Sequence, residues 1–300
     1  MRRPRGADSE DVDDAGHEVA TRPLAVLVAI AAAVQPPPLE ALLDRASAYV
    51  DRFEHDFAQV IGDEDYRQHV SGAMYRRAEN RRTQAEMLFL WMAPQHDWLT
   101  VRNVLVVDGT PVPNAEHRLT AAFGPTSEAP LVQLRRLRDE SAKFNIGRTF
   151  RNVNYPTMAL HVLEEKYRSR FRFTLDGREK VDGVDAWRIA YAEEGRPTMI
   201  QSERGDNLFA HGQLWASASD GTIVRSTLEV SIPATDTAMT TTVDYRRDAK
   251  LAMWVPGRMH ESIEQRAQGA AKRDIVSERI ECTATYTNYR RFETSGRVIQ

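Results

Sequence analysis

The chain has 300 residues, of which 42% are hydrophobic and 28% are charged, and its formal net charge is −3 at pH 7. These values are ordinary for a globular protein with one large domain or two small ones, and they argue against a disordered chain. So small a net charge predicts neither nucleic-acid binding nor strong attraction to an anionic membrane.

The first informative segment is an apolar run, Leu24–Val34, with the sequence LAVLVAIAAAV. It has the length of a signal-peptide hydrophobic region and is too short to span a membrane. Arg22 precedes it, Ala31–Ala33 supplies the small residues of a cleavage site, and Pro36–Pro38 prevents helical continuation. The alternative is a short buried helix, but such a helix would carry polar residues on one face, and this run carries none.

The segment before Arg22 contains six acidic residues, whereas the start of a signal peptide should be short and basic. Initiation at Val19 instead of Met1 would give a compact basic start. We therefore expect residues 1–35 to be a leader and signal peptide, and residues 36–300 to be a single domain. The mature protein is expected to be periplasmic or otherwise extracytoplasmic, without an integral membrane span.

The mature chain opens with an amphipathic pattern over Leu39–Ile61, whose apolar positions follow i, i+3, i+4, i+7 spacing. Gly62 is expected to end this helix. From about Tyr66 the period changes, and Gln84–Ala93 and Trp98–Val107 are apolar on both faces of the pleat. Such strands are expected to be covered on both sides.

A loop is predicted from Pro111 to about Pro130, followed by helices over Leu131–Phe144 and near Thr157–Glu165. The second half of the chain reads as a run of hairpins. Its predicted strands are Arg170–Leu175, Ala186–Ala192, Gly212–Ala218, Thr222–Ile232, Ala238–Arg246, Leu251–Val255 and Ile275–Phe292.

Asp-Gly pairs recur at Asp108-Gly109, Asp176-Gly177, Asp182-Gly183 and Asp220-Gly221. An Asp-Gly pair between alternating strands is a strong hairpin signal, because both turn positions need positive φ. We therefore predict an α+β fold with a large curled antiparallel sheet of about nine or ten strands in sequential, meander order. The helix over residues 39–61 and two further helices are expected to cover the concave face.

The C-terminal phrases resemble a known family. They are Gly212-Gln213-Leu214-Trp215 with Asp220-Gly221 and Val224-Arg225, then Val243-Asp244-Tyr245-Arg246 leading to Trp254-Val255-Pro256. Together with the export signal and first helix they resemble the LolA/LolB-like lipoprotein carriers, and the amino-terminal domain of RseB-type envelope sensors. The resemblance implies an incomplete barrel whose apolar cavity, capped by helices, receives acyl chains.

The sequence contains no pattern typical of catalysis. The eight histidines form no His-Glu-x-x-His pair and no zinc-finger spacing, and His55-Asp56 and His96-Asp97 fit surface positions. The single cysteine, Cys282, lies on a predicted strand and is interpreted as structural. No nucleophile elbow, P-loop or dinucleotide fingerprint occurs. We expect no enzymatic activity, no cofactor and no metal.

The predicted strands carry more large or flexible apolar side chains than one layer of helices would cover. Methionine and tryptophan among them suit an adaptable apolar pocket. The candidate cavity-lining residues are Met87, Phe89, Trp91, Trp98, Trp187, Leu214, Trp215, Leu228, Met239, Met253 and Trp254. They favour a carrier for the acyl chain of a lipid or lipoprotein. The alternatives are a well-filled core in an envelope sensor or scaffold that binds a protein segment, or an uncharacterised hydrolase.

Overall fold

The computed structural model describes residues 36–92, 97–123, 130–149, 151, 155–202, 204–268 and 274–291. The predicted leader and signal peptide, and His96, lie outside the described residues. The described residues from Pro37 onward belong to one compact unit.

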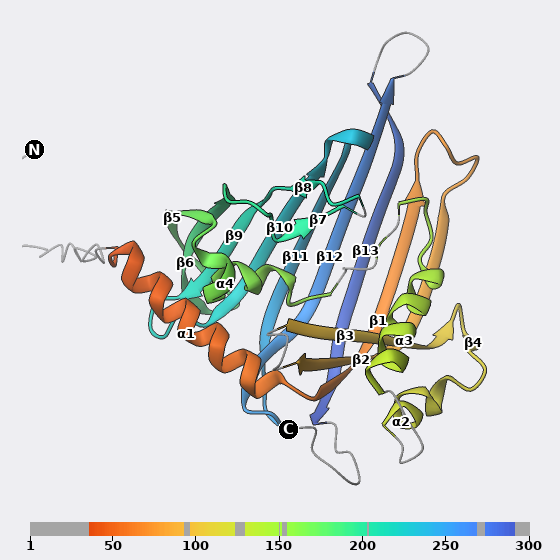
Figure 1. Ribbon diagram of the computed structural model, residues 1–300, viewed down its shortest axis with the longest axis horizontal. Coiled ribbons are helices and arrows are strands. Elements are labelled where there is room, and N and C mark those ends of the chain that lie inside the picture. The colour runs from red at the N-terminus through yellow and green to blue at the C-terminus, as the bar shows by residue number, and fades with distance from the viewer. Residues whose placement is uncertain are drawn as a thin grey trace, which may run out of the picture. The chain divides into compact units, whose positions relative to one another are not determined.

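An antiparallel sheet of 11 strands dominates this unit, in the order β4-β3-β2-β1-β13-β12-β11-β10-β9-β6-β5 (Figure 1). Its strands are β1 (Val60–Ser71), β2 (Glu79–Met92), β3 (Asp97–Val107), β4 (Thr110–Pro111), β5 (Phe171–Val181), β6 (Val184–Glu193), β9 (Ala210–Ser217), β10 (Ile223–Ile232), β11 (Thr237–Asp248), β12 (Met253–Gln268) and β13 (Asp274–Arg291). Two short strands, β7 (Ile200–Gln201) and β8 (Asn207–Leu208), form a separate pair. The predicted α+β class with a large, unclosed antiparallel sheet is confirmed.

The strand order is sequential only in part. Strands β9 to β13 form a meander, as do β1 to β4, but β1 lies beside β13, with Tyr66 opposite Ala284. The first strand thus pairs with the last, and β4 and β5, which follow one another in the chain, occupy opposite edges. Hairpin signals specify only neighbours joined by a short turn, so they could not reveal this long-range pairing.

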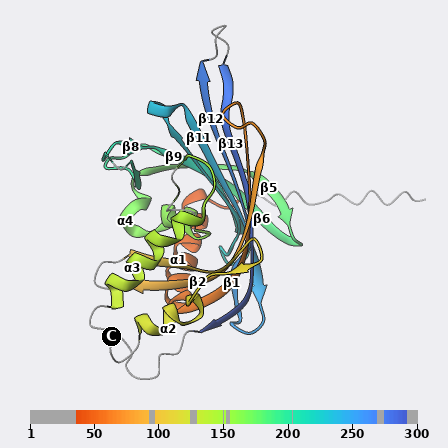
Figure 2. The same cartoon turned by 90° about the vertical axis from the view of Figure 1, so that its right-hand side faces the viewer.

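Helix α1 (Leu39–Phe57) is amphipathic, and one stripe of its surface is buried. It lies on the concave side of the curved sheet (Figure 2). The helix is shorter than expected, because Gln59 turns the chain with φ 60° and Val60 already begins β1. Gly62 therefore does not end the helix; it lies in β1, where a Cβ would come within 2.6 Å of the Tyr289 ring.

Strands β2 and β3 are covered on both faces, as predicted. Met87 and Phe89 point into the core that contains α1, whereas Leu88, Leu99 and Val101 pack on the opposite side with Leu134 of α3 (Pro130–Ser141). Helix α2 (Arg118–Ala122), which follows the 3-10 turn η2 (Ala115–His117), belongs to the same outer layer. The helix expected over residues 131–144 is thus present, but it covers the outer face and not the concave one.

The concave side carries a second cover besides α1. The 3-10 segment η4 (Met158–Leu163) and the short helix α4 (Glu165–Arg168) correspond to the helix expected near residues 157–165. All buried apolar residues of η4 belong to the same core cluster as α1. The remaining short segments are η3 (Ala142–Phe144) and η5 (Pro233–Thr235). Among the described helices, none has the length and apolar character needed to cross a bilayer.

Three of the four Asp-Gly pairs lie at strand ends. Asp182-Gly183 joins β5 to β6 with φ values of 46° and 85°, which are the values that a two-residue hairpin turn needs. Asp176-Gly177 is different, because it lies inside β5, where the pairing with β6 shifts between Leu175 and Arg178. This pair forms a bulge and not a hairpin.

Aromatic rings fix α1 against the sheet. The Phe57 ring lies 4.7 Å from that of Phe53 and 4.7 Å from that of Phe89 on β2, between ring centroids. It also lies 5.7 Å from the Tyr289 ring on β13. A single helix residue therefore joins the two halves of the sheet on either side of the β1–β13 pairing.

Replacing Phe53 by Ala should lower the free energy of unfolding by about 3–5 kcal/mol, because Phe53 is only 3% exposed and its ring stacks on Phe57. Urea denaturation followed by circular dichroism measures this. Arg52→Ala, an exposed position on the same helix, is the control and should change stability by about 0.5 kcal/mol or less. A loss below about 1 kcal/mol for Phe53→Ala would mean that α1 is peripheral.

Candidate functional site

Ten of the eleven predicted cavity-lining residues meet in one hydrophobic cluster with α1 and η4. Seven are buried: Met87, Phe89, Trp98, Trp187, Leu214, Leu228 and Met253. Trp91, Met239 and Trp254 are half-buried and pack against the cluster, and Trp254 also touches a second cluster. The structure therefore brings these ten residues together in one cluster that extends from β2 and β3 to β6, β9, β10, β11 and β12, and their role in lining a ligand cavity stays a prediction.

Trp215 does not belong to this surface. It lies in the second cluster, with Val181, Ala186 and Val224. Its indole N–H donates to Glu179, and the Arg225 guanidinium lies 5.7 Å from the ring centroid. The physical reason is the pleat: successive residues of a strand point to opposite faces, so Leu214 and Trp215 cannot both face α1.

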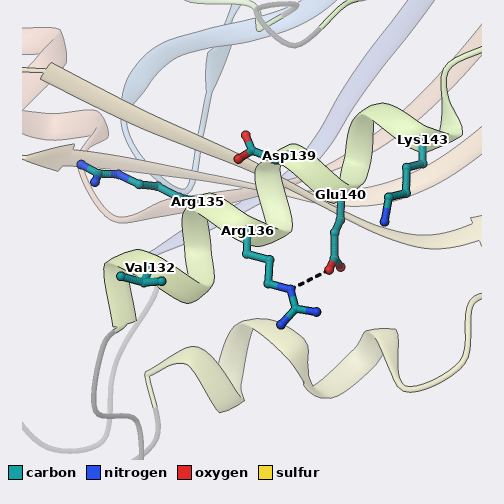
Figure 3. Close-up of a pocket in the computed structure, with 6 residues that line it drawn as sticks. All are labelled: Val132, Arg135, Arg136, Asp139, Glu140 and Lys143. Carbon is teal, nitrogen blue, oxygen red and sulfur yellow. Dashed lines mark hydrogen bonds and ion pairs between the residues drawn. The ribbon is translucent and has the colours of Figure 1, made fainter.

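The concave surface is occupied by the protein's own side chains. Cavities lie elsewhere among the described residues, and three of them are lined by none of the eleven residues. One of about 540 Å³ runs along α3 between Val132 and Lys143, where Arg136 pairs with Glu140 at 2.9 Å (Figure 3). The others, of about 410 and 660 Å³, include Arg172 and Glu229, and Asp63 and Arg290, respectively. Charged residues on all three suit polar ligands better than acyl chains.

Beyond the apolar surface, the same face of the sheet carries buried charges in pairs. Glu64 on β1 accepts two hydrogen bonds from Arg102 on β3, at 2.6 and 2.9 Å. The Tyr66 hydroxyl donates to Glu261 at 2.6 Å. Buried charges require such partners. These paired polar side chains mark where the apolar surface ends on this face of the sheet.

Cys282 lies in this polar region. It is 1% exposed, and the Arg151 guanidinium donates to its sulfur at 2.9 Å. Burial raises the pKa of the Cys282 thiol above its ordinary value, and this effect outweighs the nearby Arg151 charge. A buried thiol with a raised pKa is a poor nucleophile, which agrees with the structural role expected from the sequence.

Polar contacts join α1 mainly to the η4–α4 segment. The Ser47 hydroxyl donates to the Leu163 carbonyl at 2.9 Å, and Arg168 pairs with Asp44 at 2.9 Å and with Glu40 at 3.1 Å. The carboxylates of these two ion pairs are largely exposed, so each pair contributes only about 0–1 kcal/mol. On its other side α1 meets Gly221 in the β9–β10 turn, where a Cβ would lie 2.5 Å from the helix backbone.

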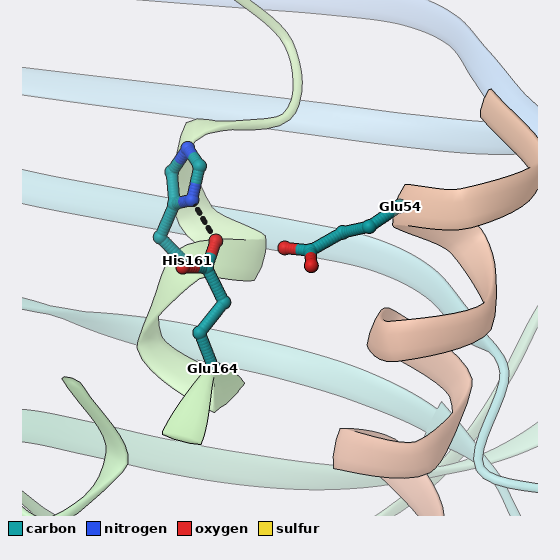
Figure 4. Close-up of side chains that lie close together, drawn as sticks. All are labelled: Glu54, His161 and Glu164. Atoms are coloured by element: carbon teal, nitrogen blue, oxygen red, sulfur yellow. Dashed lines mark hydrogen bonds and ion pairs between the residues drawn. The ribbon is translucent and has the colours of Figure 1, made fainter. Parts of the chain in front are cut away.

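One cluster of ionisable groups lies between α1 and η4. Glu54 reaches from α1 toward His161 and Glu164, and His161 Nδ1 is hydrogen-bonded to the Glu164 carboxylate (Figure 4). One potential ligand atom from each of the three residues lies within 4.8 Å of the others. His161 and Glu164 are each 5% exposed. Two carboxylates and an imidazole thus meet where α1 contacts the segment that covers the concave face.

The two carboxylates differ in acidity. Burial, followed by the hydrogen bond to the neighbouring Glu164 carboxylate, raises the pKa of Glu54 to about 8. Burial also tends to raise the pKa of Glu164, but the hydrogen bond from His161 and the positive charge of Lys166 lower it below its ordinary value. Glu54 therefore holds its proton more tightly than Glu164 does.

Sequence reasoning missed this cluster. His161 and Glu164 are three residues apart, a spacing that brings side chains together on one turn, and this was the one available signal. Glu54 lies more than a hundred positions earlier in the chain, so only the docking of α1 on η4 brings it close.

No protein-family model matches the sequence, and no curated protein matches it. Solved structures do match. A DUF1329 family protein from Desulfovibrio piger is 11% identical, with 87% of this chain and 99% of that chain covered and a TM-score of 0.37. A putative outer membrane lipoprotein-sorting protein domain from Vibrio parahaemolyticus is 10% identical, with 85% and 95% covered and a TM-score of 0.37.

A LolA superfamily protein from Nitrosomonas europaea is 11% identical, with 85% of this chain and 94% of that chain covered and a TM-score of 0.30. At such identities and TM-scores these matches assign the chain neither a family nor a function.

Proposed function

We propose that this protein is a non-enzymatic carrier that binds an acyl chain of a lipid or lipoprotein on the concave face of its sheet, in the space that α1 now fills. The observation that carries the proposal is the extent of the apolar surface beneath α1. It is drawn from seven strands of the large sheet and includes four tryptophans besides Phe89, Met87 and Met253.

Acyl binding on this face requires α1 to move, because the apolar side chains beneath it are buried. Several features make α1 the element that moves. No side chain caps its N-terminus, where Pro38 takes the cap position, and its two ion pairs with Arg168 are largely exposed. Most helical stability comes from packing of the apolar stripe, so a ligand that takes over those contacts releases the helix.

The free energy gained by burying an acyl chain is comparable with the free energy lost when α1 leaves the sheet. Each methylene removed from water contributes about 0.8 kcal/mol, so an acyl chain replaces the burial lost when α1 leaves the sheet. Met87, Met239 and Met253 add unbranched side chains that adapt to a flexible ligand. The outer face of β2 and β3 is unsuited, because α2 and α3 cover it.

The first test is binding of a fluorescent fatty acid, followed by quenching of tryptophan emission. Trp91→Leu should weaken binding about tenfold, a loss of about 1.4 kcal/mol, because its half-buried ring belongs to the concave cluster. Trp215→Leu is the matched control, since its ring lies in the other cluster, and it should bind as the unaltered protein does.

Melting temperatures are measured beside binding, so that a loss of affinity is separated from unfolding. Absence of saturable binding by the unaltered protein, or equal weakening by both variants, would contradict the carrier role. The alternative, a scaffold that binds a protein segment, would then take its place, with β5 at the end of the strand order as the available sheet edge.

We further propose that the protein is exported through a cleaved signal peptide and works outside the cytoplasm. The apolar run Leu24–Val34, with the small residues Ala31–Ala33 near its end, supports this proposal. N-terminal sequencing of protein recovered from the periplasm or medium should find a start close to Val34–Pro36. Recovery of the acidic leader on a cytoplasmic protein would refute export.

A further inference from the structure

The contact between α1 and η4 gathers two carboxylates and an imidazole from two separate segments of the chain. Glu54 and Glu164 bring two carboxylates together, and Lys166 Nζ lies 3.2 Å from Oε2 of Glu164. The other Glu164 oxygen, Oε1, faces His161. Glu54 also stands in the last turn of α1, where the negative end of the helix dipole disfavours a further negative charge.

We propose that Glu54, His161 and Glu164 form a binding site for a divalent transition-metal ion of the zinc class, which fastens α1 to η4. The three side chains supply two oxygen donors and one nitrogen donor from two separate segments of the chain. A divalent cation placed among them compensates both carboxylates and the helix end at once.

The donor set selects the class of ion. Calcium and magnesium take six or more oxygen ligands, whereas an imidazole nitrogen with carboxylate oxygens suits zinc and its neighbours. Three protein ligands leave one position of a tetrahedral zinc ion for water. Tyr155 supports the imidazole from behind, with its hydroxyl 3.4 Å from His161 Nε2, and such a second partner orients a metal-binding histidine.

The distances are close to those that zinc needs. Ligand atoms about 2.0–2.1 Å from a tetrahedral zinc ion lie roughly 3.4 Å apart, whereas the three here lie within 4.8 Å. Glu54 therefore has to move toward the other two side chains, whereas His161 and Glu164, which are hydrogen-bonded to each other, have to separate to admit the ion.

The test uses the full chain, stripped of metal with a chelator and titrated with zinc chloride in a calorimeter. One zinc ion per chain should bind, and Glu54→Gln, which keeps the shape of the side chain and removes its charge, should weaken binding about tenfold or more. Hydrogen exchange supplies a second measurement: zinc should increase protection of α1 amides in the unaltered protein and leave them unchanged in Glu54→Gln.

His55→Gln is the matched control, because His55 neighbours Glu54 on α1 but its side chain is 90% exposed and is hydrogen-bonded to the adjacent Asp56. It should bind zinc as the unaltered protein does. Absence of saturable zinc binding, binding by Glu54→Gln equal to that of the unaltered protein, or loss of binding in His55→Gln would each overturn the proposal. No apolar ligand is present in this experiment, so its failure leaves the carrier role untouched.

Discussion

The burial of the α1 apolar stripe against the concave face of the sheet is the contact on which the rest of this structure depends. An open sheet of eleven strands, with β4 and β5 as its two edge strands, exposes a wide apolar surface unless another element covers it. In this chain the cover is the segment immediately before the first strand, and Phe57 joins it to both β2 and β13. The same contact that stabilises the fold therefore occupies the surface where an apolar ligand would bind, so stability and binding compete for one set of side chains.

The polar contacts around α1 are arranged unevenly, and this determines how the helix can move. Its hydrogen bond and ion pairs run to the η4–α4 segment, through Ser47 and Arg168, and the Glu54 cluster lies at the same boundary. The central sheet contributes mainly apolar packing to the helix, together with the close approach at Gly221. An acyl chain can replace apolar packing but not these polar contacts. We therefore expect α1 and η4 to separate from the sheet together, or from each other only when the Glu54 cluster opens.

Local patterns in the sequence were sufficient for most of the elements but not for their long-range placement. The 3.6-residue period of α1, the two-faced strands β2 and β3, and the turn at Asp182-Gly183 all follow from residues close together in the chain. The pairing of β1 with β13 depends on residues more than two hundred positions apart, and nothing in a single sequence reports it. The bulge at Asp176-Gly177 has the same dipeptide as a hairpin, so composition alone could not distinguish the two.

The candidate site also has one part that follows from local sequence patterns and one part that depends on long-range contacts. The clustering of its apolar residues follows from local patterns, because alternation along each strand assigns residues to faces. Trp215 neighbours Leu214 on one strand and therefore lies on the other face, and Trp254 beside Met253 reaches the same second cluster. The cluster of Glu54, His161 and Glu164 was not predictable, since it exists only where α1 docks on η4.

The most direct test of the account is hydrogen exchange of the native protein with and without a saturating fatty acid. If the ligand takes the place of α1, amides of residues 39–57 should lose protection on binding, while those of the central strands β12 and β13 keep theirs. Binding of the fatty acid with the protection of α1 unchanged or increased would contradict the claim that the helix and the ligand occupy the same surface.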